Sequence, residues 1–167
     1  TGPNHYFIQD VPYQFELGGP SHEGCAGLLG LADYLKAVAG SGVEGIPSRS
    51  VVERAFDVMA ACEGPLQARV LEYLRSKPSV RIVGPETDGE DRVGTISFVH
   101  SEKSSREITE IVDRTEVAIR HGHMYAYRLC EALELQPEDG VVRMSLVHYN
   151  TPDEIEKLIE VLDRALD

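Results

Sequence analysis

The alternation of apolar and polar residues along the chain predicts short strands separated by amphipathic helices. Apolar or alternating runs that end at glycine, proline or charged residues predict four strands, at residues 80–83, 93–100, 117–120 and 141–147. Apolar residues three or four positions apart predict helices over residues 21–39, 50–77, 104–115, 125–133 and 152–166. This order predicts an α/β (α+β) domain whose small, mostly antiparallel four-stranded sheet is covered by helices.

Four short sequence features predict where helices begin or are interrupted. Ser50, Ser104 and Thr151 each stand three residues before a glutamate, which is the capping-box pattern of a helix start. Pro65 lies inside the second predicted helix. Because a proline removes a backbone hydrogen bond and crowds the preceding turn, we expect a kink or a break near Gly64.

The length and the composition describe a globular domain with an acidic surface. The 167 residues, of which 42% are hydrophobic and 26% charged, suit one domain with a sizeable core. The net charge of −12 argues against a nucleic acid or an anionic membrane as partner. No apolar run has the length of a membrane span, and no signal peptide is recognisable. The three widely spaced cysteines, Cys25, Cys62 and Cys130, lie in helical patterns, which predicts buried thiols in a reducing cytoplasm.

One charged residue interrupts the fourth predicted strand. Arg143 lies between Val141 and Met144, and a buried guanidinium without a partner is very costly. Its planar fork suits a bidentate contact with a substrate carboxylate, whereas an ion pair with Glu131 or Glu134 would be structural. The strand pattern by itself favours the structural pair, because ion pairs are common at such positions.

The third predicted strand leads into a glycine turn with two histidines. His121 and His123 fall on one side of an extended segment, and His148 or His22 would complete a metal site. No carboxylate or cysteine stands at a supporting spacing, so we predict no metal. Two interpretations remain, namely loop histidines bonded to the backbone, or contact with an anion or a cofactor near neutral pH.

A second candidate site for a ligand precedes the first helix. The segment Gly18-Gly-Pro-Ser-His22 would present free backbone N–H groups at a helix start, where a phosphate binds readily. Such turns are common, so the indication is weak by itself. The sequence contains no P-loop, no dinucleotide fingerprint and no nucleophile–histidine–acid set.

Five segments, taken in chain order, match the pattern of one known family. They are Phe15–His22 with the glycine-rich helix that follows it, Val80–Pro85, Gly94–Phe98, Arg120–His123 and Val142–Thr151. Together they resemble class V aminotransferases and cysteine desulfurases, and the Tyr-Asn-Thr run at the end is the most specific match. The resemblance covers nearly all of this chain but only the C-terminal part of a family member.

The resemblance implies a pyridoxal-phosphate (PLP) enzyme of the aspartate-aminotransferase fold type, normally a homodimer, that acts on an amino acid. Residues 21–167 would be its C-terminal small domain, and residues 1–20 an extended lead-in from the large domain. The family's cofactor-binding lysine lies upstream, and none of Lys36, Lys77, Lys103 and Lys157 stands in its motif. We therefore expect a fragment that is inactive alone, since a missing N-terminal large domain would carry the cofactor.

The resemblance also assigns roles to single residues. Arg143 matches the arginine that holds the substrate α-carboxylate, which reverses the preference for a structural ion pair. Tyr125 stands where desulfurases have the cysteine that forms a persulfide. Because tyrosine cannot form one, transamination, lyase or epimerisation chemistry is at least as well supported as desulfuration.

The remaining assignments concern contacts with the cofactor and the substrate. Gly19 replaces the threonine that reaches the cofactor phosphate of the neighbouring subunit, so that only a backbone N–H contact remains. Ser21 and His22 are expected beside it as cofactor contacts, and His123 is expected to contact the substrate. The competing interpretation is a non-catalytic α/β module that binds a partner or a metal through the histidine-bearing edge.

Overall fold

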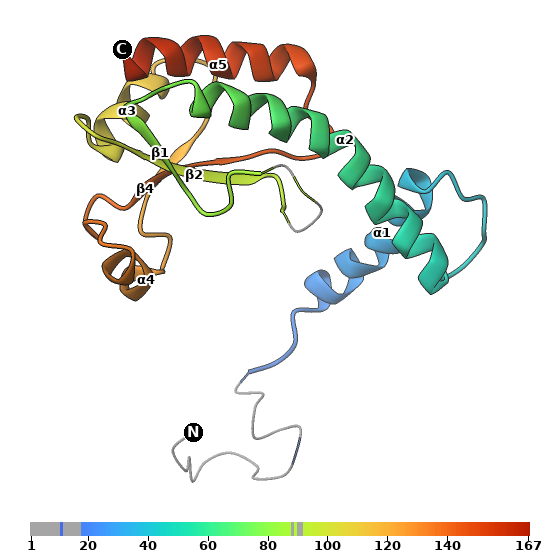
Figure 1. The fold of residues 1–167 in the computed structure, drawn as a ribbon. Helices are drawn as coiled ribbons and strands as arrows, with labels where there is room; N and C mark the ends of the chain where they lie inside the picture. The colour runs from blue at the N-terminus through green and yellow to red at the C-terminus, as the bar shows by residue number, and fades with distance from the viewer. Residues whose placement is uncertain (1–10, 12–17, 88, 90–91) are drawn as a thin grey trace, which may run out of the picture. The chain divides into compact units, whose positions relative to one another are not determined.

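The computed structural model describes residues 11, 18–87, 89 and 92–167 (Figure 1). Most of the predicted lead-in segment 1–20, including the start of the matching segment at Phe15, therefore lies outside the described residues. The chain forms two compact units, Thr1–Ala55 and Phe56–Asp167. The site residues proposed for the substrate all belong to the second unit.

The first unit contains helix α1 (His22–Val38) and the start of helix α2 (Arg49–Arg75). Ser21 caps α1 as predicted, because its hydroxyl accepts a hydrogen bond from the backbone N–H of Gly24 at 3.0 Å. No residue of α1 is buried within the part of the chain that the structure describes. Leu28 and Leu29 are 64% and 75% exposed, so the apolar stripe of this helix is not covered there.

Helix α2 differs from its prediction in two respects. It begins at Arg49, so Ser50 lies inside the helix and does not cap it. The carbonyl of Ser48 accepts the first backbone bonds, and the two serine hydroxyls bond each other at 3.0 Å. The helix also continues through Pro65 without a break. Proline costs one backbone bond, and this loss is offset because the following residues are buried in the core, namely Leu66, Val70, Leu71 and Leu74.

The second unit is built around a four-stranded sheet. Its strands are β1 (Val80–Val83), β2 (Thr95–His100), β3 (Arg120–Gly122) and β4 (Val141–Ser145). They lie in the order β1-β2-β4-β3, and each neighbouring pair is antiparallel. The prediction of a small, mostly antiparallel sheet with four strands is confirmed.

Strand β3 begins later than predicted. The apolar pattern from Val117 indicated a strand, but pairing with β4 begins only at Arg120. Val117 packs against the core and Ile119 is 7% exposed. The apolar residues before β3 are therefore explained by core packing and not by strand pairing.

Helices cover one face of this sheet. Helix α3 (Ser105–Val112) and helix α5 (Pro152–Leu166) both begin with the predicted capping boxes, at Ser104 and Thr151, and helix α4 (Tyr127–Ala132) is short. The C-terminal part of α2 and α5 lie along the same side of the sheet (Figure 1). The core between helices and sheet includes Leu71, Leu74, Ile82, Ile96, Phe98, Ile108, Val112, Val142, Met144, Leu158 and Leu162.

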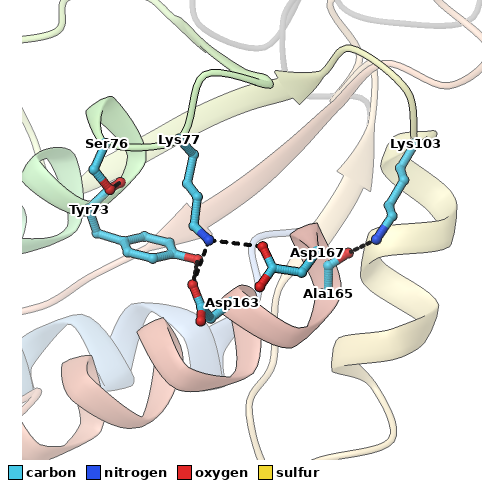
Figure 2. A network of polar contacts seen from close by, with 7 residues as sticks. All are labelled: Tyr73, Ser76, Lys77, Lys103, Asp163, Ala165 and Asp167. Atoms are coloured by element: carbon cyan, nitrogen blue, oxygen red, sulfur yellow. Dashed lines mark hydrogen bonds and ion pairs between the residues drawn. The ribbon is translucent and has the colours of Figure 1, made fainter.

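A polar network joins the end of α2 to the end of α5 (Figure 2). Lys77 pairs with Asp163 at 2.6 Å and with Asp167 at 3.0 Å, and the hydroxyl of Tyr73 donates to Asp163 at 3.3 Å. Burial raises the pKa of Tyr73, so its phenol remains a hydrogen-bond donor. The hydrogen bond from Lys77 lowers the pKa of the Asp163 carboxyl. The network ties the C-terminal end of α5 to the end of α2.

The prediction of three buried thiols is wrong for two of the cysteines. Cys130 is buried, but Cys25 and Cys62 are exposed. Helical spacing identifies an apolar stripe without showing whether anything covers it, and α1, which carries Cys25, has no buried residue. No described helix is long and apolar enough to span a membrane.

Candidate functional site

The strand register places Arg143 in a row of residues that crosses all four strands. Arg143 pairs with Ser97 on β2 and with Arg120 on β3. Ser97 in turn pairs with Val83 on β1. Because directly paired residues point to the same side of a sheet, these four side chains share one face. We call it the outer face.

The other face, which we call the inner face, is the one that the helices cover. Val142 and Met144, the neighbours of Arg143 in β4, are 0% and 2% exposed and belong to the core. Alternation along the strand therefore directs Arg143 away from the core helices. The guanidinium stands on the side of the sheet that α2, α3 and α5 leave free.

Arg143 has no acidic partner among the described residues. Its side chain is half-buried, and its Nε atom is buried without a hydrogen-bond partner. The structural ion pair with Glu131 or Glu134 is not formed there, as no such contact is present. A half-buried guanidinium without a counter-charge is costly, which favours the interpretation that Arg143 binds an anion.

The turn after β3 holds His123 and Tyr125 together. The backbone N–H of Tyr125 donates to Nδ1 of His123 at 3.1 Å, and the two rings meet edge to face with centroids 6.5 Å apart. Met124 and Tyr125 have φ angles of 50° and 62°, which side chains other than glycine adopt at a cost. The tight turn leaves Tyr125 fully exposed.

The two histidines do not form a pair on one side. His121 pairs with Val142 and therefore lies in an inner-face position, whereas His123 accepts a backbone hydrogen bond in the turn. The backbone bonding expected by one of the two interpretations is present at His123, while contact with an anion or a cofactor stays a prediction. Within the described residues, no group of three or more histidine, cysteine, aspartate and glutamate side chains is arranged to hold a metal.

Two glycines fix the place where this turn leaves the sheet. A Cβ atom on Gly140 would lie 2.0 Å from the carbonyl carbon of Gly122, and the φ of Gly140 is 66°. The two residues form an isolated bridge. Nearby, Asp139 accepts the backbone N–H groups of Ser105 and Arg106 at 2.7 and 3.2 Å. The start of β4 is thereby anchored to both β3 and α3.

Sequence reasoning did not identify Tyr127 as a neighbour of the turn. Its ring meets that of His123 edge to face, with centroids 5.9 Å apart. Its hydroxyl donates to Glu138 at 3.3 Å, and the Glu138 carboxylate raises the pKa of Tyr127. A tyrosine two residues after a tight turn is a weak pattern, which explains why the sequence did not reveal it.

The pocket beside β3 shares one residue, Arg120, with the row that contains Arg143 and Ser97. It has a volume of about 700 Å³, and the residues that line it are Thr109, Asp113, Ala118, Ile119, Arg120, His121 and Met124. Arg143 does not line it. Arg143, Ser97 and Val83 therefore lie outside this pocket.

The predicted cofactor contacts belong to the first unit. The Ser21 hydroxyl already accepts the Gly24 N–H as the helix cap. Gly19 is exposed, and a Cβ atom there would meet nothing within 4 Å. His22 is exposed at the first position of α1. The assignment of these three residues to a cofactor stays a prediction.

The four lysines of the chain do not fit covalent attachment of PLP. Each ammonium group already has a partner, which is Asp33 for Lys36, Asp163 for Lys77, the Ala165 carbonyl for Lys103 and Glu116 for Lys157. A lysine that attacks a carbonyl must be uncharged and free to approach it. In this structure all four ammonium groups are therefore engaged in hydrogen bonds or ion pairs.

The described residues thus form an antiparallel α+β sheet with an unpaired arginine on its outer face. The class V aminotransferase family matches residues 2–158, so the chain belongs to that family. The aminotransferase-like protein FGM3 of Gibberella zeae is 40% identical over 116 residues, which is 68% of this chain and 29% of that protein. A probable cysteine desulfurase of Mycobacterium leprae is 33% identical over 94% of this chain and 33% of its own length.

Solved structures agree with the fold. The cysteine desulfurase CsdA of Escherichia coli matches with a TM-score of 0.67 and 20% identity, over 95% of this chain and 34% of that one. The chain thus spans about a third of the length of the proteins it matches. Class V aminotransferases and cysteine desulfurases are in general PLP-dependent enzymes, and the resemblance to this family is confirmed.

Proposed function

We propose that the chain is the C-terminal part of a PLP-dependent enzyme that acts on an amino acid, and that Arg143 holds the α-carboxylate of the substrate. One observation carries this proposal. The Arg143 guanidinium is half-buried on the outer face, its Nε lacks a partner, and no acidic side chain among the described residues neutralises it. A bidentate carboxylate would satisfy both the charge and the hydrogen-bonding groups.

The residues of the turn favour chemistry other than desulfuration. Tyr125 occupies the position of the persulfide-forming cysteine, and a phenol cannot carry a persulfide. Bound PLP supplies an electron sink for a carbanion at the substrate. Arg143 would orient the substrate against it, and His123 would contact the substrate from the turn. Transamination, elimination and epimerisation all fit these roles.

The proposal places the remaining parts of the active site outside this chain. A preceding large domain would carry the lysine that binds PLP, which accords with a chain one third as long as its relatives. Gly19, Ser21 and His22 would contact the cofactor phosphate through backbone N–H groups at a helix start. The intact enzyme would be a homodimer, as its family pattern implies, and its free cysteines fit a reducing cytoplasm. The 167 residues alone would be inactive.

The test is a substrate screen of the full-length protein with added PLP. Sulfide release from L-cysteine and ketoacid formation from a panel of L-amino acids are measured in parallel. We expect turnover of at least one amino acid without stoichiometric sulfide. Failure of every amino acid to react or to change the PLP absorbance would overturn the proposal. A PLP absorbance band with turnover in the 167-residue chain would contradict the assignment of the lysine to another segment.

A further inference from the structure

Two arginines face each other directly on the outer face of the sheet. Arg120 in β3 and Arg143 in β4 are paired in register, so their Cβ atoms lie roughly 5 Å apart and their charges repel. Like charges in opposed positions destabilise a sheet. An acidic neighbour in the fold or an anion from outside would relieve this repulsion.

Neither arginine forms an ion pair within the described part of the chain, although Asp113 lines the same pocket as Arg120. Two arginines form ion pairs, Arg69 with Glu156 at 2.7 Å and Arg49 with Glu53 at 2.9 Å, whereas exposed arginines such as Arg81 form none among the described residues. Neither Arg120 nor Arg143 takes part in an ion pair among the described residues. The protein has a net charge of −12, so this local excess of two positive charges is contrary to the overall balance.

One α-carboxylate would neutralise only half of this excess. A guanidinium binds one carboxylate through two parallel N–H groups, and the α-carboxylate occupies Arg143 in the proposed function. Arg120 would then remain a second, exposed cation beside the bound substrate. A substrate with another carboxylate on its side chain would neutralise both charges and engage both forks.

We infer that Arg120 is a specificity-determining residue that binds the side-chain carboxylate of the substrate, so that the enzyme acts on a dicarboxylic amino acid. The inference rests on the proposed function, because it takes Arg143 as the contact for the α-carboxylate. Ser97, the residue paired with Arg143 on β2, adds a hydroxyl to the same row. The outer face thus recognises two anionic groups rather than one.

The experiment separates the two arginines by the ligand that each recognises. Binding of succinate and of its half-amide, succinamate, to the full-length PLP-loaded protein is measured by isothermal titration calorimetry. Arg120→Gln should raise the Kd of succinate by about tenfold or more, since a charged hydrogen-bond pair is lost. The Kd of succinamate, which has a single carboxylate, should stay unchanged. Arg143→Gln should weaken both ligands.

Two further variants complete the set. Arg81→Gln removes an exposed arginine that pairs with Val99 in β2, and it should change neither Kd, which excludes a general effect of charge. Arg120→Lys keeps the charge without the planar fork, so the Kd of succinate should fall between the values for the wild type and Arg120→Gln. The ratio of kcat/KM for L-aspartate to that for L-asparagine should fall in Arg120→Gln.

The outcomes distinguish this inference from the function it rests on. Equal weakening of succinate and succinamate by Arg120→Gln would overturn the inference and leave the role of Arg143 intact. So would a wild-type protein that binds succinamate as tightly as succinate. If Arg143→Gln leaves the binding of both ligands unchanged, the proposed function itself fails.

Discussion

The two faces of the sheet use neighbouring residues for opposite purposes. On the inner face, Ile96 and Phe98 are fully buried against the helices. On the outer face, Ser97 stands between them in sequence and belongs to the row of Arg143 and Arg120. Because strand residues alternate between faces, β2 and β4 each contribute to the core and to the candidate site. The comparison separates the residues that hold the fold together from those that are free to bind a substrate.

The largest expected effect comes from the inner face. Phe98→Ala should lower the free energy of unfolding by about 3–5 kcal/mol, because it leaves a cavity in the core. Ser97→Ala, one residue earlier and on the outer face, is the matched control and should change it by about 0.5 kcal/mol or less. Urea unfolding followed by circular dichroism measures both. Similar losses for the two variants would refute the division of roles between the faces.

The next effect concerns the connection between β3 and β4. Gly140→Ala should lower the free energy of unfolding by about 1–3 kcal/mol. The φ of 66° is unfavourable for alanine, and the added Cβ would collide with Gly122. Gly42→Ala is the control, because a Cβ atom there meets nothing within 4 Å. Thermal unfolding compares the two proteins. Equal melting temperatures for both variants would show that the glycine contact does not fix the strand.

A smaller effect, of opposite sign, is expected on the outer face. Arg120→Gln removes one of two like charges placed opposite each other, and it should raise the free energy of unfolding by about 0.2–1 kcal/mol. The gain should shrink at high salt, which screens the repulsion. Urea unfolding at low and high ionic strength tests this prediction. A loss of stability would mean that Arg120 has a stabilising partner within the fold.

The acid dependence of stability should come from carboxylates on the helices and not from the arginines of the outer face. Backbone hydrogen bonds from Ser104 and Thr151 lower the pKa of Glu107 and Glu154, and the bond from Lys77 lowers that of Asp163. A carboxyl with a lowered folded-state pKa stabilises above its unfolded pKa, and this contribution is lost as the pH falls through the folded value. Stability should therefore decline below about pH 4.5, the ordinary glutamate value.

Two variants, one at a helix start and one on the outer face, make this pH prediction specific. Glu154→Gln should flatten the decline between about pH 4.5 and pH 2, because one of the titrating caps is gone. Arg120→Gln should leave the slope unchanged, since an arginine stays charged throughout this range. The midpoints of urea unfolding, measured for the wild type and both variants across the pH series, test these two expectations. The same slope in wild type and Glu154→Gln would argue against the capping carboxylate as a source of acid sensitivity.

The parts of the fold that depend on local sequence were predictable. Ser21, Ser104 and Thr151 cap helices through bonds to residues three positions on. Strands β1, β2 and β4 follow from their apolar patterns, whereas β3 begins later than its pattern indicated. Ser50 does not cap α2 as predicted, because the helix begins one residue earlier and the carbonyl of Ser48 accepts its first backbone hydrogen bonds. Of the kink or break expected near Gly64, the break is absent, because core packing compensates the bond that Pro65 removes. Tertiary packing thus overrides a local preference at Pro65, whereas the start of α2 is decided by residues close together in sequence.

The candidate site was predictable only in part. The family pattern singled out Arg143, and the turn residues His123 and Tyr125 do lie together. The opposition of Arg120 and Arg143 depends on the register of two strands that are distant in sequence, which a hydrophobic pattern does not specify. The exposure of Cys25 was missed for a similar reason, as an apolar stripe does not reveal its cover.

The most direct test of the central claim is the specificity of Arg143→Gln in the full-length protein. The measured quantity is kcat/KM for the best amino-acid substrate and for the corresponding amine, which lacks only the α-carboxylate. Loss of a bidentate charged contact should lower the value for the amino acid by about a hundredfold, while the low value for the amine stays unchanged. An equal loss for both compounds would show that Arg143 supports the structure and does not hold the substrate carboxylate.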